Sequence, residues 1–238
     1  MKSRAAVVAI VVAATTLAAC GSPSAPSDEH VFTFDFARSA EGWTSGFCDF
    51  PVGWEPQMEL VAEHRGLPSP LDQGGGGLYI AGNNHSDDLF MFWKGRVGGL
   101  QPGGTYSVDI SIQFATNIPK GVGGIGGSPD TSVFVKVGGS STEPVVVAVD
   151  AAGRREYNLS IDKGNQSQSG KGAVVIGTAG NLSGTATWEL KELKSGPSRL
   201  SLTAAPDGSA WLLVGTDSGF EGPTALYYTR VGAQFVPQ

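Results

Sequence analysis

The sequence predicts an all-β fold, a jelly-roll-like antiparallel β-sandwich. No window after residue 30 sustains a helical period for three turns, whereas short alternating or β-branched runs recur along the chain. The 35 glycines and 14 prolines fall largely between these runs, which is typical of the turns of a sandwich or barrel. The strands are too many for a minimal immunoglobulin domain, and the Cys…Trp…Cys pattern of that fold is missing.

We expect the strands in the following order along the chain. They lie near residues 31–36, 58–63, 77–81, 89–97, 105–115, 132–137, 144–149, 156–161, 173–178, 186–193, 200–204, 210–214 and 225–231. Apolar and polar residues alternate strictly from Tyr106 to Phe114, which predicts a strand with one solvent-exposed face. Pro206-Asp207-Gly208 is a turn signal, so the strands on either side of it are predicted to pair as a hairpin.

The first twenty residues resemble the export signal of a bacterial lipoprotein. A cationic start is followed by an uncharged run from Ala5 to Leu17, about 13 residues, where a membrane-spanning helix needs about 20. The run ends in Leu17-Ala18-Ala19-Cys20, which is similar to the lipobox, in which the cysteine is acylated and becomes the new N-terminus. The sequence therefore predicts a signal peptide over residues 1–19. The alternative is an ordinary secretory signal with an incidental cysteine.

Residues 20–30 are predicted to form the lipid-bearing cysteine and a flexible tether, because the segment is small, polar and rich in proline. Residues 31–238 are predicted to form a single β-sandwich domain. The protein is thus expected in the bacterial cell envelope, lipid-anchored on the extracytoplasmic side of a membrane. We expect a monomer.

The charged residues, cysteines and histidines of the sequence limit the kinds of ligand and metal site that it can form. Without residues 1–19 the chain keeps 14 Lys and Arg against 22 Asp and Glu, a net charge of −8, which argues against nucleic acid and anionic lipid headgroups as ligands. With Cys20 acylated, Cys48 has no partner for an intramolecular disulfide, and we interpret it as a buried small hydrophobe rather than a nucleophile. His30, His64 and His85 lie too far apart in the sequence to suggest a zinc site.

Three polar motifs are candidates for a metal or ligand site. They are residues 83–94, 162–170 and 211–222. Oxygen ligands closely spaced in glycine-rich segments suit calcium, although no EF-hand spacing exists. The predicted metal ligands are Asp87, Asp88, Asp217 and Glu221. The alternative for each motif is a structural network that satisfies its own loop.

The same motifs suggest a surface for a hydroxyl-rich ligand such as a glycan. Trp54 is the tryptophan most expected to be exposed, because Gly53 and Pro56 place it in a loop, and sugar rings stack on exposed aromatic faces. Trp93 and Trp211 lie in apolar runs and are assigned to the core. The predicted ligand-binding residues are Trp54, His85, Asp162, Lys163, Asn165 and Gln166.

Several strings together resemble a family of uncharacterised bacterial secreted proteins and lipoproteins. They are Gly42-Trp43…Gly46-Phe47-Cys48-Asp49-Phe50-Pro51, Asn83–Lys94, Gly126-Gly127-Ser128-Pro129, Asp162–Gln166 and Val214–Tyr228. This resemblance implies no function. The segments at the two ends, around Phe34-Asp35-Phe36 and Leu226-Tyr227-Tyr228, resemble carbohydrate-binding jelly rolls, a likeness that concerns the fold.

Three classes of function remain open from the sequence. The first is a non-catalytic binding module for a glycan, stabilised by calcium. The second is a structural envelope protein. The third is a hydrolase that uses clustered polar residues, for which the candidates are His85, Asp87, Asp88, Asp162, Lys163, Asp217 and Glu221. Convergence of the three polar motifs around one cleft would favour a functional site.

Overall fold

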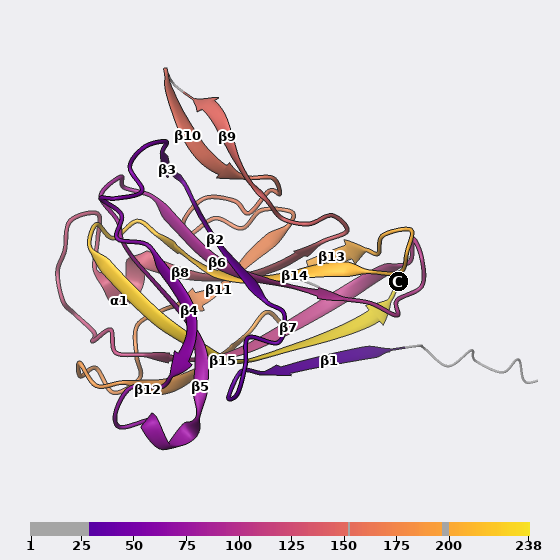
Figure 1. Cartoon of the computed structure of the whole chain (residues 1–238), viewed down its shortest axis with the longest axis horizontal. Helices are drawn as coiled ribbons and strands as arrows, with labels where there is room; N and C mark the ends of the chain where they lie inside the picture. The colour runs from indigo at the N-terminus through magenta and orange to yellow at the C-terminus, as the bar shows by residue number, and fades with distance from the viewer. Residues whose placement is uncertain (1–28, 152, 197–199) are drawn as a thin grey trace, which may run out of the picture.

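A computed structural model describes residues 29–151, 153–196 and 200–238. The chain forms two antiparallel sheets packed face to face, an all-β jelly-roll-like sandwich as predicted (Figure 1). The predicted signal peptide, Cys20 and most of the predicted tether lie outside the described residues. Within those residues, no helix is both long and apolar enough to cross a bilayer.

Sheet A has seven strands, and its longest strand, β15, lies in the middle. The main order is β12-β7-β15-β5-β4, with β1 also paired to β15 and β13 also paired to β7. One side of β15 pairs with β7, and the other side pairs with β5 at one end and β1 at the other. The strands are β1 (His30–Asp35), β4 (Val61–Gly66), β5 (Gly76–Asn83), β7 (Thr105–Thr116), β12 (Glu189–Lys194), β13 (Leu200–Thr203) and β15 (Pro223–Pro237).

Sheet B has five strands in the order β11-β8-β14-β6-β2. These are β2 (Thr44–Cys48), β6 (Leu89–Val97), β8 (Val133–Ser140), β11 (Ala173–Thr178) and β14 (Ala210–Ser218). A third, three-stranded sheet is made by β3 (Phe50–Pro51), β9 (Val146–Ala151) and β10 (Arg154–Leu159), and its β9–β10 hairpin projects from the sandwich (Figure 1). The helical pieces are short: α1 (Pro129–Ser132) and a 3-10 turn, η1 (Asp72–Gly74).

Strand β6 is apolar on both faces because both faces of sheet B are covered. Leu89, Met91 and Trp93 point into the main core between the sheets. Phe90 and Phe92 point the other way, into a second core. The other residues of this second core come from β2, β10, β11 and β14: Cys48, Leu159, Ala173 and Leu213. Cys48 is fully buried there, as the sequence indicated.

The structure corrects three predictions about the strands. The turn at 205–209 forms, with a hydrogen bond of 2.7 Å from Ala205 N to Ser209 O, but the predicted hairpin is wrong. Strand β13 pairs with β7 in sheet A and β14 pairs with β6 and β8 in sheet B, so the turn joins the two sheets. Strands β2 and β3 were not predicted. The strand predicted from residue 58 begins at Val61, because the chain turns tightly over residues 54–59.

Candidate functional site

The three polar motifs meet at one end of sheet B. Strand β14 pairs with β6 so that Ser218 lies opposite Leu89, which places Asp217 and Asp88 at the same end of neighbouring strands. Asp49, between β2 and β3, completes a group of three carboxylates, each with an oxygen atom within 4.8 Å of the others. The loop that follows β10 carries the second motif onto this group, where the amide of Gln166 donates to Asp217 Oδ2 at 3.0 Å.

Two lysines neutralise these carboxylates. Lys136 of β8 is fully buried, and its Nζ donates to Asp217 Oδ2 at 2.7 Å and to the carbonyls of Lys163 and Gln168. Lys163 Nζ lies 2.5 Å from Asp49 Oδ2 and 2.9 Å from Asp217 Oδ2. Both ammonium groups are thus paired and hydrogen-bonded, as buried charges must be. We call Asp49, Asp88, Lys136, Lys163 and Asp217 the Asp–Lys cluster.

Burial and charge set the protonation of the Asp–Lys cluster. Burial, together with the charge of Asp217 and a hydrogen bond to it, raises the pKa of Asp88 to about 9, so Asp88 is a neutral acid at pH 7. Burial opposes ionisation of Asp217, but the charge of Lys163, the hydrogen bond from Asp88 and the charge of Lys136 lower its pKa. Burial lowers the pKa of Lys136. The carboxylates around Lys163 outweigh burial and raise its pKa.

A polar cleft of about 350 Å³ opens above the Asp–Lys cluster. Three of its residues, Asp49, Asp87 and Gln166, have positive φ angles of 68°, 67° and 46°. Such backbone is unfavourable for residues with a side chain and tends to gather at functional sites. The cleft is lined by Asp49, Ser86, Asp87, Asp88, Arg154, Glu156, Tyr157, Asn158, Lys163, Gly164, Asn165 and Gln166.

The structure brings together only some of the residues predicted from the sequence. Those that line the cleft are Asp87, Asp88, Lys163, Asn165 and Gln166, and Asp217 lies buried at its base. Asp87 is exposed, whereas the adjacent Asp88 is half-buried.

The other predicted residues lie outside the cleft lining. Trp54 is 37% exposed in the turn after β3, as expected for a loop tryptophan, and His85 is exposed. Asp162 accepts hydrogen bonds from the backbone of Gly164 and Lys171 and so stabilises its own loop. The Glu221 backbone forms a bridge with Ile125 in another loop.

Two members of the Asp–Lys cluster, Asp49 and Lys136, were not predicted from the sequence. Asp49 follows Cys48 in the string Phe47-Cys48-Asp49-Phe50, a short segment with no polar motif around it. Lys136 interrupts the buried run from Val133 to Val137, and a lysine that is fully buried needs a buried partner. A charged residue in an apolar run is therefore the signal that would have found it.

The Asp–Lys cluster is a poor fit for the predicted calcium site. Of the four predicted ligands only Asp88 and Asp217 belong to the group of three carboxylates, with Asp49 as the third. The Lys163 ammonium already lies between Asp49 and Asp217, at 2.5 and 2.9 Å from their oxygens, where a cation would have to bind. A calcium ion would have to displace this ammonium and meet the positive charge of Lys136.

We therefore expect calcium to leave the stability of the protein unchanged. Addition of millimolar calcium, or of EDTA, should shift the melting temperature by less than about 1 °C, because a ligand raises stability only if it binds the folded state. Differential scanning fluorimetry at fixed ionic strength measures this, with magnesium as the control for non-specific screening. A rise in melting temperature that saturates with calcium and not with magnesium would contradict the expectation.

A second candidate site lies on the outer face of sheet A, which no other sheet of the described residues covers. Three cavities of about 510, 230 and 350 Å³ follow one another across β7, β15 and β1. The first two share Gln113 and Arg230, and the last two share Thr33, Ser111 and Lys194 among others, so they form one continuous furrow. We call this groove the furrow.

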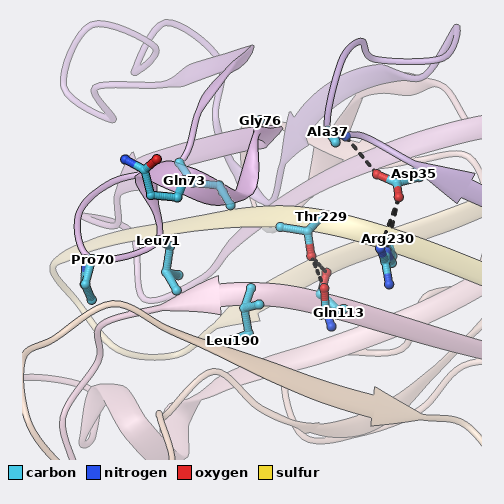
Figure 2. Close-up of a pocket in the computed structure, with 11 residues that line it drawn as sticks. Asp35, Ala37, Pro70, Leu71, Gln73, Gly76, Gln113, Leu190, Thr229 and Arg230 are labelled. Carbon is cyan, nitrogen blue, oxygen red and sulfur yellow. Dashed lines mark hydrogen bonds and ion pairs between the residues drawn. The ribbon is translucent and has the colours of Figure 1, made fainter.

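Polar side chains line the furrow. Figure 2 shows its widest part, where Arg230 pairs with Asp35 at 3.2 Å and Thr229 donates to Gln113. Leu71 and Leu190 add apolar surface beside them. The polar residues along the furrow are Thr33, Asp35, Gln73, Asp109, Ser111, Gln113, Glu192, Lys194, Thr229, Arg230 and Gln234.

An aromatic group lies on the same face. The rings of Tyr79 and Tyr227 are 4.8 Å apart, and Trp188 meets Tyr227 edge-on at 5.1 Å. The Arg65 guanidinium stacks on Tyr79, 3.4 Å from the ring centre. Trp188 and Tyr79 line a further cavity of about 370 Å³, so part of this aromatic surface is open to a ligand.

The sequence predicts the face that carries the furrow but not the furrow itself. The alternation from Tyr106 to Phe114 predicted a solvent-exposed face, and Ser107, Asp109, Ser111 and Gln113 do point outward from β7. The other walls come from β1, β12 and β15, and their pairing order was not evident from the sequence.

No family model and no curated protein matches the sequence. Solved structures are similar at the level of general architecture. A carbohydrate-binding module of the β-sandwich superfamily is 12% identical over 80% of this chain, with a TM-score of 0.35, and this chain spans only 56% of its length. A carbohydrate-binding module in complex with β-1,4-galactotriose is 11% identical, with a TM-score of 0.32 and coverage of 80% of this chain and 86% of that one. A putative sugar binding protein from Bacteroides thetaiotaomicron is 10% identical, with a TM-score of 0.30 and coverage of 86% and 91%.

Proposed function

We propose that this chain is an extracytoplasmic lipoprotein whose β-sandwich binds a carbohydrate chain along the furrow without catalysing a reaction. The observation that supports this most is the furrow itself, an uncovered, continuous groove with a dense lining of polar side chains. Neutral sugars offer many hydroxyl groups, which both donate and accept hydrogen bonds. Guanidinium groups can donate to them, carboxylates can accept from them, and amides can do both.

The charges of the furrow suit an uncharged ligand. Asp35 is paired with Arg230, and Gln113 donates to Glu192 at 2.9 Å. Lys194 lies in the same wall as Glu192. Since acidic and basic groups alternate along the furrow, neither sign dominates the field that a ligand meets. The nearby aromatic group would add stacking surface for sugar rings.

A hydrolase is less well supported by the Asp–Lys cluster. Paired carboxylates act on a substrate only if they can touch it. Asp217 is fully buried, and its Oδ2 accepts hydrogen bonds from Lys136, Lys163 and the amide of Gln166. We assign this cluster a role within the fold rather than in turnover.

We propose that acylated Cys20 holds the domain at a membrane, on the basis of residues 1–21. The start of β1 lies beside the end of β15, since His30 pairs with Phe235. The end of β15 and strand β13 both pair with the first residues of β7, so the start of β1 lies at the same end of the sandwich as the turn that joins β13 to β14. Asp88 and Asp217 lie at the other end of β6 and β14. Tether and cleft would then lie at different ends of the sandwich, leaving the face of sheet A free along its length.

Substitution of Arg230 tests the proposed function. Arg230→Ala should weaken binding of a neutral polysaccharide about tenfold, because loss of one charged hydrogen bond to a ligand costs about 1.5–3 kcal/mol. The melting temperature should stay unchanged, since the Arg230 side chain is 61% exposed and its ion pair with Asp35 is a surface pair. A glycan array identifies the ligand, and titration calorimetry then measures the affinity.

The matched control is Arg96→Ala. Arg96 is likewise exposed and paired with an aspartate, Asp207, but it lies on β6 outside the furrow lining. It should bind as the wild type does. Equal affinity for Arg230→Ala and the wild type would remove the furrow from the proposal, and absence of binding to any glycan at millimolar concentration would remove the carbohydrate.

A further inference from the structure

We propose that the folded chain joins Lys136 to Asp217 by an intramolecular amide bond, with Asp88 as the acid that assists its formation. The bond would link two neighbouring strands of sheet B through their side chains. It is a self-modification of the protein and is independent of the carbohydrate ligand proposed above.

The two reacting groups are already held against each other. Strand β8 pairs with β14, with Lys136 opposite Gly215, so Asp217 is its diagonal neighbour on the same face of the sheet. Lys136 Nζ lies 2.7 Å from Asp217 Oδ2, and both side chains are completely inaccessible to solvent. Holding two groups in this way replaces a bimolecular reaction by an intramolecular one, with effective molarities of about 10⁵–10⁸ M in favourable cases.

The surroundings supply a distinct partner for each oxygen of Asp217. The neutral acid Asp88 has a carboxyl oxygen within 4.8 Å of an Asp217 carboxyl oxygen, and the buried Oδ1 atom of Asp217 has no hydrogen-bond partner. Oδ2 accepts from Lys163 Nζ at 2.9 Å and from the amide of Gln166 at 3.0 Å. Oδ1 can thus be stabilised as negative charge develops on it, while Oδ2 lies beside an ammonium that can give it a proton.

The balanced step begins with transfer of a proton from the Lys136 ammonium to Asp217, which leaves an amine beside a carboxylic acid. Burial favours this neutral pair, and it also lowers the pKa of Lys136. The amine nitrogen then forms a bond to Cγ as Asp88 gives its proton to Oδ1, and Asp88 recovers this proton when the carbonyl group forms again. The bond from Cγ to Oδ2 breaks, Oδ2 takes a proton from Lys163 and leaves as water, and Lys163 recovers a proton from the new amide nitrogen.

The reaction removes one buried ion pair and leaves the remaining charges of the site paired. An ammonium and a carboxylate become an uncharged amide and a water molecule, which relieves the cost of keeping two charges out of water. The remaining ion pair is Lys163 with Asp49, 2.5 Å apart. Phe90, whose ring centre is 5.0 Å from Lys163 Nζ, and the rest of the second core keep bulk water away from the new bond.

Peptide mass spectrometry of the purified full chain tests the proposal. Trypsin does not cut after an acylated lysine, so the bond should yield a covalent pair of the peptides 121–154 and 200–230, lighter than their sum by one water molecule. Fragmentation should locate the link at Lys136 and Asp217. Without the bond, trypsin would release separate peptides 121–136, 137–154 and 200–230, and this result would overturn the proposal. A link from Lys163 in place of Lys136 would also overturn it.

Asp88→Asn tests the role of the acid. The amide side chain keeps the shape of the carboxyl group and can still donate a hydrogen bond, but it cannot transfer a proton. We expect this variant to fold, as judged by circular dichroism, and to lose most of the linked peptide pair. Asp207→Ala, a change at an exposed surface ion pair, is the matched control and should retain the link in full. Linkage of Asp88→Asn to the wild-type extent would remove Asp88 from the reaction.

Discussion

Replacing Asp217 by alanine is expected to lower the free energy of unfolding by about 3–5 kcal/mol, the cost of leaving buried charges without their partner. Asp217 receives hydrogen bonds from both Lys136 and Lys163, and the Lys136 side chain has no contact with solvent. The variant must either bury an uncompensated ammonium or open the loop after β10 to water. The loss is expected whether or not the amide bond has formed, since the variant cannot form it. Urea unfolding followed by tryptophan fluorescence measures the change.

Asp207→Ala provides the matched comparison for this prediction. Asp207 also pairs with a basic side chain, Arg96, at 2.6 Å, but both side chains are more than half exposed. Surface pairs contribute about 0–1 kcal/mol, so this variant should unfold close to the wild type. A loss of less than 1 kcal/mol for Asp217→Ala would show that the Asp–Lys cluster is hydrated and that burial does not govern its energetics.

Trp43→Ala should also cost about 3–5 kcal/mol, the usual range for removing a large aromatic side chain from a core. Trp43 is 3% exposed, and its ring meets Phe34 and Phe36 at 5.2 and 5.6 Å in edge-on contacts. The ring lies directly on Gly95, where a Cβ atom would be 2.3 Å from it, so no neighbouring side chain can fill the cavity from that position. The free energy of unfolding in urea reports the loss.

Trp54→Ala is the control, because the same chemical change is made at a tryptophan that is 37% exposed. Its loss should stay within about 0.5 kcal/mol, the usual range for surface substitutions. Equal unfolding midpoints in urea for the two variants would contradict the prediction. They would show that the packing of Trp43 against Phe34 and Phe36 adds little to the stability of the fold.

The sequence allowed the strands to be predicted well where one physical signal dominated. Strand β7 alternates because one face is buried and the other faces solvent, and β11 was placed at its observed bounds. Strand β2 was missed because its centre, Gly46, shows no strand preference. The glycine is required because the Phe92 ring lies where its Cβ would be, at 2.3 Å, a contact made with a strand more than forty residues away.

The candidate sites depend on strand order, which local patterns do not encode. Asp88 and Asp217 were singled out by their motifs, but their meeting requires that β14 pair with β6, and Lys136 joins them only because β8 is the other neighbour of β14. The furrow depends likewise on β1 and β7 lying on either side of β15. The predicted hairpin between β13 and β14 failed for the same reason, since a turn signal fixes where the chain reverses but not which sheet the next strand joins.

The central strand of each sheet comes late in the chain. In sheet B, β14 lies between β8 and β6, and in sheet A, β15 lies between β7 and β5. Most native pairings of both sheets therefore join residues far apart in sequence, an arrangement associated with slow folding. Neither sheet can complete its strand pairing until about the last thirty residues are available. Until then the earlier strands have unpaired edges. A chain emerging N-terminus first would complete its fold only after nearly all of it had appeared.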